Sequence, residues 1–571
     1  MTQRAYEVLP GHHGTHIKVN IRGGGILRTP RLNRGTAFTE EQRDQLGLVG
    51  LLPDGETPLD GQLHRSYQRY LKTATPLEKF AYLQGLRDRN TVLFYRLLSE
   101  HLDEMMPIVY TPTIGEAIEQ FSLWYQQIHG VFLSIDAPDR IERCLRAADR
   151  GPDDVDLIIV TDSEGILGIG DQGVGGIQIC LGKKSLYTAA AGMDPGRMIP
   201  VVLDVGTDNL ALLNDDLYLG VRHARVRGER YDDFIEAFVE AATRVFPHAM
   251  IHWEDFGANN AHRILNKYRD SVCTFNDDVQ GTAAVVAAAA LAGVRAKGER
   301  LSDQRVVIHG AGTAGIGVAD LFVDLMIAEG TPPAEARARF WATSSRGLVR
   351  DEPGLKFRDF QRPYSRPAGE VADWQLDRPG DVGLADIVRN VHPTMLIGTS
   401  GQPGSFTESL VRELASHVEQ PIIMPLSNPT MLAEATPANL LEWTAGRALI
   451  ATGSPFAPVT RGNTTFTIAQ ANNAFVFPGL GLGVAVCRAT RVTDRMIAAA
   501  AKAVASLVRI SREGQSLLPR VQDLRRVSAT VAIAVAQAAE ADGVAERPLT
   551  DPVQQVFEAM WQPVYPELIL D

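Results

Sequence analysis

Cysteine is scarce in this sequence: the 571 residues include four, at Cys144, Cys180, Cys273 and Cys487. No two of them are spaced as a CxxC pair, which argues against both a disulfide framework and a structural zinc site. We therefore expect four reduced thiols packed in the interior.

Basic tracts and long apolar runs are also missing. The formal net charge is −12 and no Lys/Arg-rich run occurs, so we expect no nucleic-acid partner. The longest apolar stretch, Ala283–Ala292, is too short to cross a bilayer, and we expect no membrane partner. The first residues carry no basic segment followed by an apolar one, as a secretory signal would, so we expect a cytoplasmic protein.

What is present is the composition of a large globular protein. Hydrophobic residues make up 45% of the chain and the mean hydropathy is −0.06. A length of 571 residues suggests about three domains. Residues 1–35 are polar and glycine-rich and read as an extended arm, whereas apolar spacings of three and four over 39–127 predict helices. We expect 1–128 to form this arm and a helical domain.

Two regions of alternating strands and helices follow, so the predicted fold class is α/β. In 129–280, short β-rich runs at Leu157–Val160, Val201–Asp204 and Met250–Trp253 predict an α/β domain with a buried sheet. In 281–472, a second set of runs predicts a doubly wound parallel sheet of the Rossmann type. Its strands are expected at Arg305–His309, Phe340–Thr343, Thr394–Ile397, Ile422–Leu426 and Ala448–Thr452. The remainder, 473–571, is expected to return to the preceding α/β domain and to end in a helical tail.

A glycine-rich turn follows the strand Val306–His309 and leads into a predicted helix. Between strand and helix, this pattern is typical of a loop that binds the pyrophosphate of a dinucleotide. The helix N-terminus then offers unpaired N–H groups to the phosphates. The alternative is a glycine-rich turn without a ligand. The predicted cofactor-binding residues of this loop are Gly310, Gly312, Thr313, Ala314 and Gly315.

The end of the next strand bears on the choice between NAD and NADP. An acidic residue there would bind the ribose hydroxyls of NAD, but this sequence has Ser344, Ser345 and Arg346 after Thr343. Two hydroxyls and a guanidinium suit a 2′-phosphate. We expect NADP tolerance or preference, with a solvated surface arginine as the alternative.

Two acidic pairs stand out: Glu254-Asp255, directly after the predicted strand Met250–Trp253, and Asp277-Asp278, after Phe275-Asn276. Three carboxylates with water and substrate oxygens would make a hard, octahedral site that suits Mg²⁺ or Mn²⁺. Spacing alone leaves open that these are ordinary capping and surface acids.

Eleven motifs in order carry a resemblance to malic enzymes. They are LNRGTAFT, MPIVYTPTIGEA, ILGIGDQG, GKKSLYTAA, LDVGT, WEDF, NKYRD, TFNDDVQGTA, GAGTAGIG, PLSNPT and ANNAFVFPG. The chain resembles this family from about Leu32 to Pro563, nearly its whole length. The resemblance implies oxidative decarboxylation of L-malate to pyruvate and CO₂, with reduction of NAD or NADP, by a homodimer or homotetramer. It also implies that 129–280 binds the substrate and the metal.

The resemblance also implies residue roles. The metal ligands would be Glu254, Asp255 and Asp278. Lys183 would be the general base, which requires a pKa pulled toward neutrality by burial and the cation. Tyr110 would be the general acid that protonates C3, and Asp277 would pair with Lys183. The expected contacts of substrate and nicotinamide are Asn428, Asn472, Asn473 and, at the substrate carboxylate, Gly165.

Gly165 is a departure, because most malic enzymes have an arginine at this position that grips the substrate carboxylate. Malolactic enzymes resemble the chain here, in EGILGIGD and IHWEDFG. They keep NAD and Mn²⁺ bound and convert L-malate to L-lactate and CO₂, which is the alternative function. A third hypothesis is a non-catalytic nucleotide-binding regulator. It would lack Lys183, Tyr110 or a metal ligand, and all of these residues are present. Arg65 and Arg89 match positions that bind an activating dicarboxylate in some family members, but ordinary ion pairs are the simpler interpretation.

Overall fold

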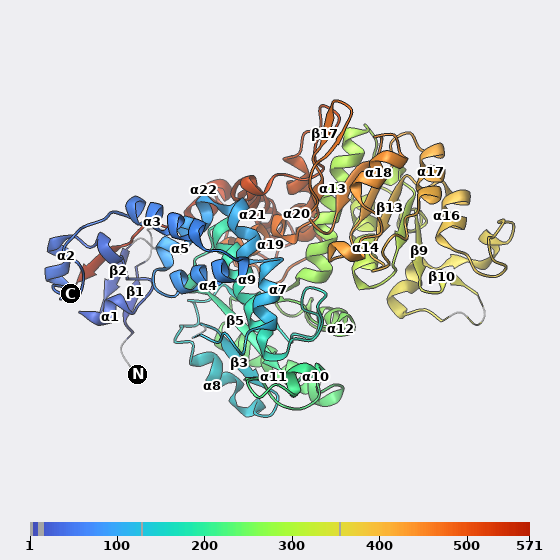
Figure 1. Cartoon of the computed structure of the whole chain (residues 1–571). Helices are drawn as coiled ribbons and strands as arrows, with labels where there is room; N and C mark the ends of the chain where they lie inside the picture. Colours follow the sequence, from blue (N-terminus) through green and yellow to red (C-terminus); the bar gives the residue numbers. More distant parts are fainter. Residues whose placement is uncertain (1–3, 10–15, 127–128, 353, 355, 571) are drawn as a thin grey trace.

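The computed structural model describes residues 4–9, 16–126, 129–352, 354 and 356–570. A helical N-terminal region lies at one end of the molecule, a five-stranded sheet lies in the middle and a seven-stranded sheet lies at the other end (Figure 1). Long helices near the C-terminus pack between them. The α/β class, with a doubly wound sheet and a second α/β sheet, is confirmed.

The N-terminal helices begin at recognisable caps. In α4 (Pro76–Arg87), the Thr75 side chain accepts from Glu78 N and the Glu78 carboxylate accepts from Thr75 N, a capping box that satisfies two otherwise unpaired donors. The neighbouring helices are α3 (Leu59–Lys72), α5 (Thr91–Glu100), α6 (Leu102–Val109) and α7 (Thr113–Glu119).

The stretch expected to be an extended arm instead contributes two strands to a small sheet. β1 (Tyr6–Val8) pairs with β2 (His16–Val19), and β2 pairs in parallel with β19 (Glu567–Leu570). The first strands and the last strand of the described chain therefore lie side by side, as the blue and red strands of Figure 1 show. Residues 1–3, 10–15 and 127–128 of the expected N-terminal domain lie outside the described residues.

The five-stranded sheet is parallel throughout, in the order β3-β5-β4-β6-β7. Every residue of its central strand and of the two strands beside it is buried, because helices cover both faces. One face packs against α11 (Glu229–Val245). The strands are β3 (Val131–Ser134), β4 (Leu157–Thr161), β5 (Met198–Asp204), β6 (Met250–Trp253) and β7 (Thr274–Asn276).

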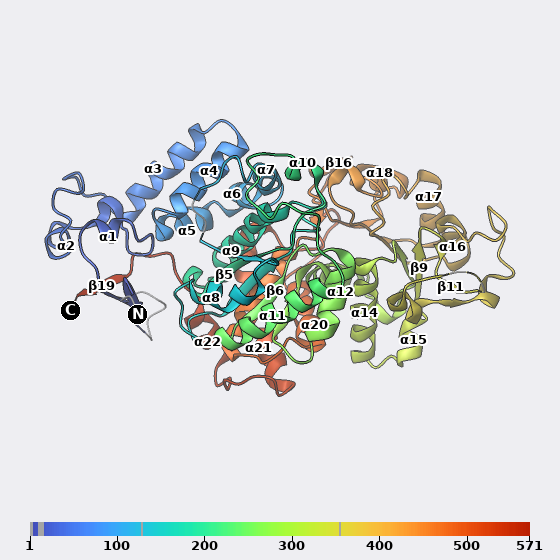
Figure 2. The same ribbon diagram turned by 90° about the horizontal axis from the view of Figure 1, so that it is seen from below.

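The seven-stranded sheet has the order β10-β9-β8-β13-β14-β15-β18, and only the edge strand β10 is antiparallel. Helices cover both of its faces (Figure 2). The strands are β8 (Val306–His309), β9 (Phe340–Ser344), β10 (Gly347–Leu348), β13 (Met395–Gly398), β14 (Ile422–Pro425), β15 (Leu449–Thr452) and β18 (Ala469–Gln470). The helices are α14 (Thr313–Ala328) on one face and α16 (Leu384–Val391), α17 (Glu408–His417) and α18 (Pro437–Trp443) on the other.

The alanine-rich run forms the core helix α13 (Thr282–Ala296). The segment Asp277–Ala296 is long and apolar enough to cross a membrane, but 78% of its apolar window is buried in the protein, as expected for a core helix. α13 packs against α14 and α20 (Asp494–Ser506), and α20 packs against α21 (Leu524–Ala541). The domain boundaries at 128, 280 and 472 stay predictions.

The four cysteines are free. Cys180 and Cys487 are buried, whereas Cys144 and Cys273 are half-buried. The expected packing in the interior is found for Cys180 and Cys487.

Candidate active site

The two acidic pairs lie together because β6 and β7 are parallel neighbours. Their register places Trp253 beside Asn276. The acidic pair that follows each strand therefore lies at the same edge of the sheet. The amide of Asp255 donates a hydrogen bond of 2.9 Å to Asp278 Oδ2. Both carboxyl ends thus open into the crevice where an α/β sheet binds its ligands.

Three of these carboxylates form a candidate metal site. One oxygen each from Glu254, Asp255 and Asp278 lies within 4.8 Å of the others. Burial, followed by repulsion from Glu254, raises the pKa of Asp255 and of Asp278 well above the ordinary range. A divalent cation would offset this repulsion, and an all-oxygen donor set suits Mg²⁺ or Mn²⁺. The residues therefore fit the expected metal.

Lys183 is buried beside the same cluster. It lies on α9 (Ile177–Ala191), is 1% exposed, and its ammonium lies 3.0 Å from Glu254 Oε1. It also donates a short hydrogen bond to Asp277 Oδ2, so the expected pair is present.

Without a metal, the pKa of Lys183 is raised rather than lowered, and the lower pKa expected with a cation bound stays a prediction. Burial lowers the pKa, but the charges of Asp277 and Glu254 outweigh burial and raise it well above the ordinary lysine value. The sequence analysis named burial, a cation and the pairing with Asp277, but not the approach of Glu254, whose charge adds to that of Asp277.

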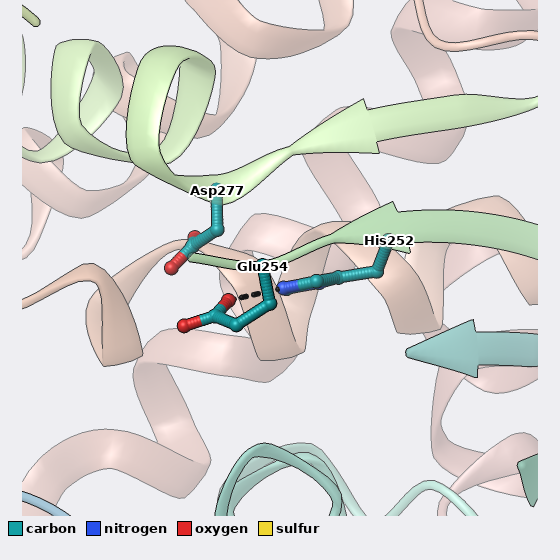
Figure 3. A group of neighbouring side chains, drawn as sticks. All are labelled: His252, Glu254 and Asp277. Atoms are coloured by element: carbon teal, nitrogen blue, oxygen red, sulfur yellow. Dashed lines mark hydrogen bonds and ion pairs between the residues drawn. The ribbon is translucent and has the colours of Figure 1, made fainter. Parts of the chain in front are cut away.

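A buried chain of hydrogen bonds holds Glu254 from behind. His252 Nε2 lies 2.7 Å from Glu254 Oε2, and His252 Nδ1 lies 2.8 Å from the hydroxyl of Tyr187. Figure 3 shows the imidazole directed at the Glu254 carboxylate, with Asp277 above it. His252, Glu254 and Asp277 are also close enough to form a metal-binding group. Both imidazole nitrogens are already engaged, however, which favours the all-carboxylate set.

Tyr110 lies against Lys183. It follows α6, is 7% exposed, and its ring centroid is 5.2 Å from the Lys183 ammonium nitrogen. Burial raises the pKa of Tyr110, and the Lys183 charge only partly opposes this. The phenol is therefore protonated and can act as a proton donor.

These groups line one cavity of about 290 Å³ between the two sheets. Asn428 follows β14, and Asn472 follows β18. Asn473 donates to Asp277 Oδ2 at 3.1 Å and so supports the Asp277–Lys183 pair. The cavity is lined by Tyr110, Gly165, Lys183, Glu254, Asp255, Asp277, Asp278, Asn428, Asn472 and Asn473, among others. The structure thus brings together all the predicted catalytic, metal-binding and substrate-binding residues; their roles stay predictions.

Gly165 lies at the wall of this cavity, close to backbone atoms. A Cβ at this position would lie 3.0 Å from Phe256 O and 3.3 Å from Asp255 O. A larger residue would therefore require the backbone of 255–256 to shift. Among the described lining residues, Lys183 is the one cation.

The glycine loop has the geometry expected for a dinucleotide. Gly310 has φ +108°, and a Cβ there would lie 2.5 Å from the carbonyl carbon of Thr399, so only glycine fits. Gly312 has open space where its Cβ would be, and no side chain caps the start of α14. A Cβ at Gly315 would clash with Gly310 O. The loop, including Thr313 and Ala314, therefore leaves backbone donors open to a pyrophosphate.

The residues expected to choose the cofactor lie beside this loop. Ala311 N donates to Thr343 O at 2.6 Å, which joins the loop to the end of β9. Ser345 and Arg346 are exposed, and Arg346 N donates to Ser344 Oγ at 3.2 Å. The Arg346 guanidinium donates to Lys356 O at 3.3 Å.

Several polar residues at or beside the cavity were not predicted from the sequence. Thr111 and Gln470 line the cavity, and His252 and Tyr187 support Glu254. Strand alternation places His252 on the same face as Glu254, which is a signal that could have found it.

Comparisons with known proteins agree with these features. Residues 87–269 match the model of the malic enzyme N-terminal domain, and residues 279–540 match that of the malic enzyme NAD-binding domain. NAD-dependent malic enzyme 3 of Bacillus subtilis is 52% identical over 96% of this chain and 97% of its own. NAD-dependent malic enzyme of Sodalis glossinidius is 48% identical over 95% of each chain. The structure of Entamoeba histolytica malic enzyme has a TM-score of 0.55 at 21% identity, over 89% of this chain and 93% of its own.

Proposed function

The chain belongs to the malic enzyme family, and from that premise we propose that it oxidises and decarboxylates L-malate to pyruvate and CO₂ with NAD as the acceptor. The observation that carries the proposal is the single cavity in which Lys183, Tyr110 and three clustered carboxylates meet. The NAD-dependent malic enzymes of Bacillus subtilis and Sodalis glossinidius support the choice of acceptor.

Glu254, Asp255 and Asp278 would hold the divalent metal, and the glycine loop would hold the dinucleotide. When bound, the metal supplies Lewis-acid polarisation of substrate oxygens and the nicotinamide accepts hydride. The protein positions malate between them, which converts a bimolecular encounter into an oriented one.

Two residues of the chain handle protons. Lys183, in its neutral form, would accept the proton of the C2 hydroxyl, and Asp277, which is hydrogen-bonded to its amino group, holds the lysine side chain in place. Tyr110, next to Lys183, donates a proton to C3 after CO₂ has left. Asn428 and Asn472 would orient the substrate by amide hydrogen bonds.

The proposal also includes acceptance of NADP beside NAD. Ser345 and Arg346 are exposed at the end of β9, where a 2′-phosphate would lie. Since the named relatives are NAD-dependent, we expect NAD to be the better acceptor and NADP to be accepted more weakly.

We further propose a homodimer or homotetramer. Two segments, 123–124 and 217–219, carry exposed apolar side chains that a partner subunit could cover. The segments are neighbours, because Leu219 N donates a hydrogen bond of 3.3 Å to Ser122 Oγ. The exposed side chains are those of Leu123, Trp124, Leu217 and Leu219. Light scattering during size-exclusion chromatography would test this, and a monomer would refute it.

The function is tested by following NADH absorbance with L-malate, MnCl₂ or MgCl₂, and NAD⁺ or NADP⁺. We expect reduction of the dinucleotide that EDTA abolishes. The alternative, malolactic activity, is favoured by Gly165, and it would produce lactate without net reduction of the dinucleotide.

A further inference from the structure

A second cavity, of about 240 Å³, lies beside a different face of α9 from the one that borders the candidate active site. Lys183 and Lys184 are consecutive, so their side chains leave the helix about 100° apart. Lys183 lines the active-site cavity and Lys184 lines the second one. The second cavity also meets the C-terminal end of α4, where Arg87 and Asp88 line it.

Cations outnumber carboxylates around this cavity. Arg31, Arg87, Arg150 and Lys184 line it, against Asp88. Asp194, next to the lining residue Pro195, pairs with Arg31 at 2.7 Å, and so balances that arginine. Asp88 lies 3.3 Å from Arg87 Nε.

Two of the cationic groups have bonding capacity to spare. The Lys184 ammonium donates to the Met198 carbonyl at 3.1 Å, and no described carboxylate lies within ion-pair distance of it. The Nη2 atom of Arg87 is buried and has no hydrogen-bond partner among the described residues. Lys184 is therefore a half-buried cation without an anionic partner among the described residues, and Arg87 keeps one free donor atom beside its pair with Asp88. A ligand that supplies negative charge would stabilise both groups.

The pKa values agree with this excess of positive charge. Burial, followed by the charges of Arg87 and Arg150, lowers the pKa of Lys184 to about 7, with Arg31 adding to this and Asp194 opposing it. Burial also lowers the pKa of the lining residue His129. A bound anion would reverse the electrostatic part of this shift.

We propose that this cavity binds a small anion that carries a carboxylate or phosphate group, with Lys184 and Arg87 as its principal ligands. Its volume fits a small metabolite rather than a larger ligand. Tyr95, Leu181 and Pro195 provide apolar wall, so a short apolar stem beside the charged group would also fit. Arg65 and Arg89 do not line this cavity. Anion binding here does not depend on which reaction the chain catalyses.

The test is isothermal titration calorimetry of the metal-free, full-length protein with inorganic phosphate and, separately, with succinate. Lys184→Met and Arg87→Met keep much of each side chain's apolar length but remove its charge. Lys502→Met, at an exposed position on α20, is the matched control. We expect saturable binding of at least one anion to the wild-type protein, weakened about tenfold or more by either cavity variant and unchanged by Lys502→Met. The anion that binds more tightly identifies the head group.

Equal affinity in the wild type and in both cavity variants would overturn the proposal, as would the absence of binding by both anions. If the variants fold poorly, wild-type crystals soaked in selenate decide the matter. Electron density between Lys184 and Arg87 would support the site, and an empty cavity at saturating selenate would refute it.

Discussion

His252 positions Glu254, and replacing it should loosen the metal site without touching any ligand. The imidazole is fully buried, with Nε2 at 2.7 Å from Glu254 Oε2 and Nδ1 at 2.8 Å from the Tyr187 hydroxyl. If the Tyr187 hydroxyl donates to Nδ1, then Nε2 carries the hydrogen and donates to the carboxylate. This leaves Glu254 Oε1 facing Lys183 and the cation site.

The size of the effect follows from the two hydrogen bonds. In His252→Leu, the lost bond to a charged carboxylate costs about 1.5 to 3 kcal/mol, and the Tyr187 hydroxyl left unpaired costs about 1 to 3 kcal/mol. We therefore expect a loss of about 3 kcal/mol or more in the free energy of unfolding of this region. Removal of a group that orients a metal ligand typically weakens metal binding by about 10- to 100-fold.

The assay is a titration of the metal-free protein with Mn²⁺, followed by the electron paramagnetic resonance signal of the free ion. His252→Gln is the matched control, because its amide can still donate to Glu254, and it should recover most of the affinity. Thermal unfolding of each variant checks that it folds. Wild-type Mn²⁺ affinity in folded His252→Leu would refute the positioning role.

Three further results are expected. Lys183→Met should lower kcat by at least about 100-fold while leaving the NAD⁺ affinity, measured by fluorescence, unchanged. Turnover at the wild-type rate would show that Lys183 is not the general base. Gly312→Ala should fold normally, since its Cβ meets open space, but it should weaken NAD⁺ binding. Gly310→Ala should lower the unfolding temperature, because φ +108° disfavours a side chain. A destabilised Gly312→Ala together with a normally stable Gly310→Ala would contradict the assignment of the loop. The pKa of Lys184 in the folded protein, about 7, lies below the ordinary lysine value of about 10.4. The charged lysine therefore lowers the free energy of unfolding by its full amount below pH 7, and this destabilisation decreases as the pH rises toward about 10.4. In anion-free buffer, Lys184→Met should therefore unfold at a higher temperature than the wild type at pH 6, with a gap that narrows toward alkaline pH; a constant or widening gap would contradict the shift.

Much of the fold could be predicted because its strands end at local signals. β6 has the bounds expected for it, Met250–Trp253, since an apolar run there stops at two acids. β8 and β9 differ from expectation by one residue each. The pairing of β2 with β19 could not be predicted, because it joins distant segments through backbone hydrogen bonds and leaves no local pattern.

The site shows the same division between local and distant effects. Glu254 and Asp255 could be placed at the carboxyl end of a strand because the apolar run before them is a local signal. That Asp277 and Asp278 lie at the same edge follows from the pairing of β6 with β7, which the sequence did not predict. The pKa of Lys183 was not predictable, since it depends on how closely Asp277 and Glu254 approach in three dimensions. The contact between His252 and Tyr187 joins a strand to a helix, and one sequence does not reveal which polar groups meet across such an interface.

The balance of products from L-malate tests the central claim most directly. The purified enzyme would be incubated with L-malate, Mn²⁺ and NAD⁺, and NADH, pyruvate and lactate would be measured in the same sample. Equal amounts of NADH and pyruvate, without lactate, are the predicted result. Lactate formed without accumulation of NADH would contradict the oxidative reaction and make Gly165 the residue that sets the outcome.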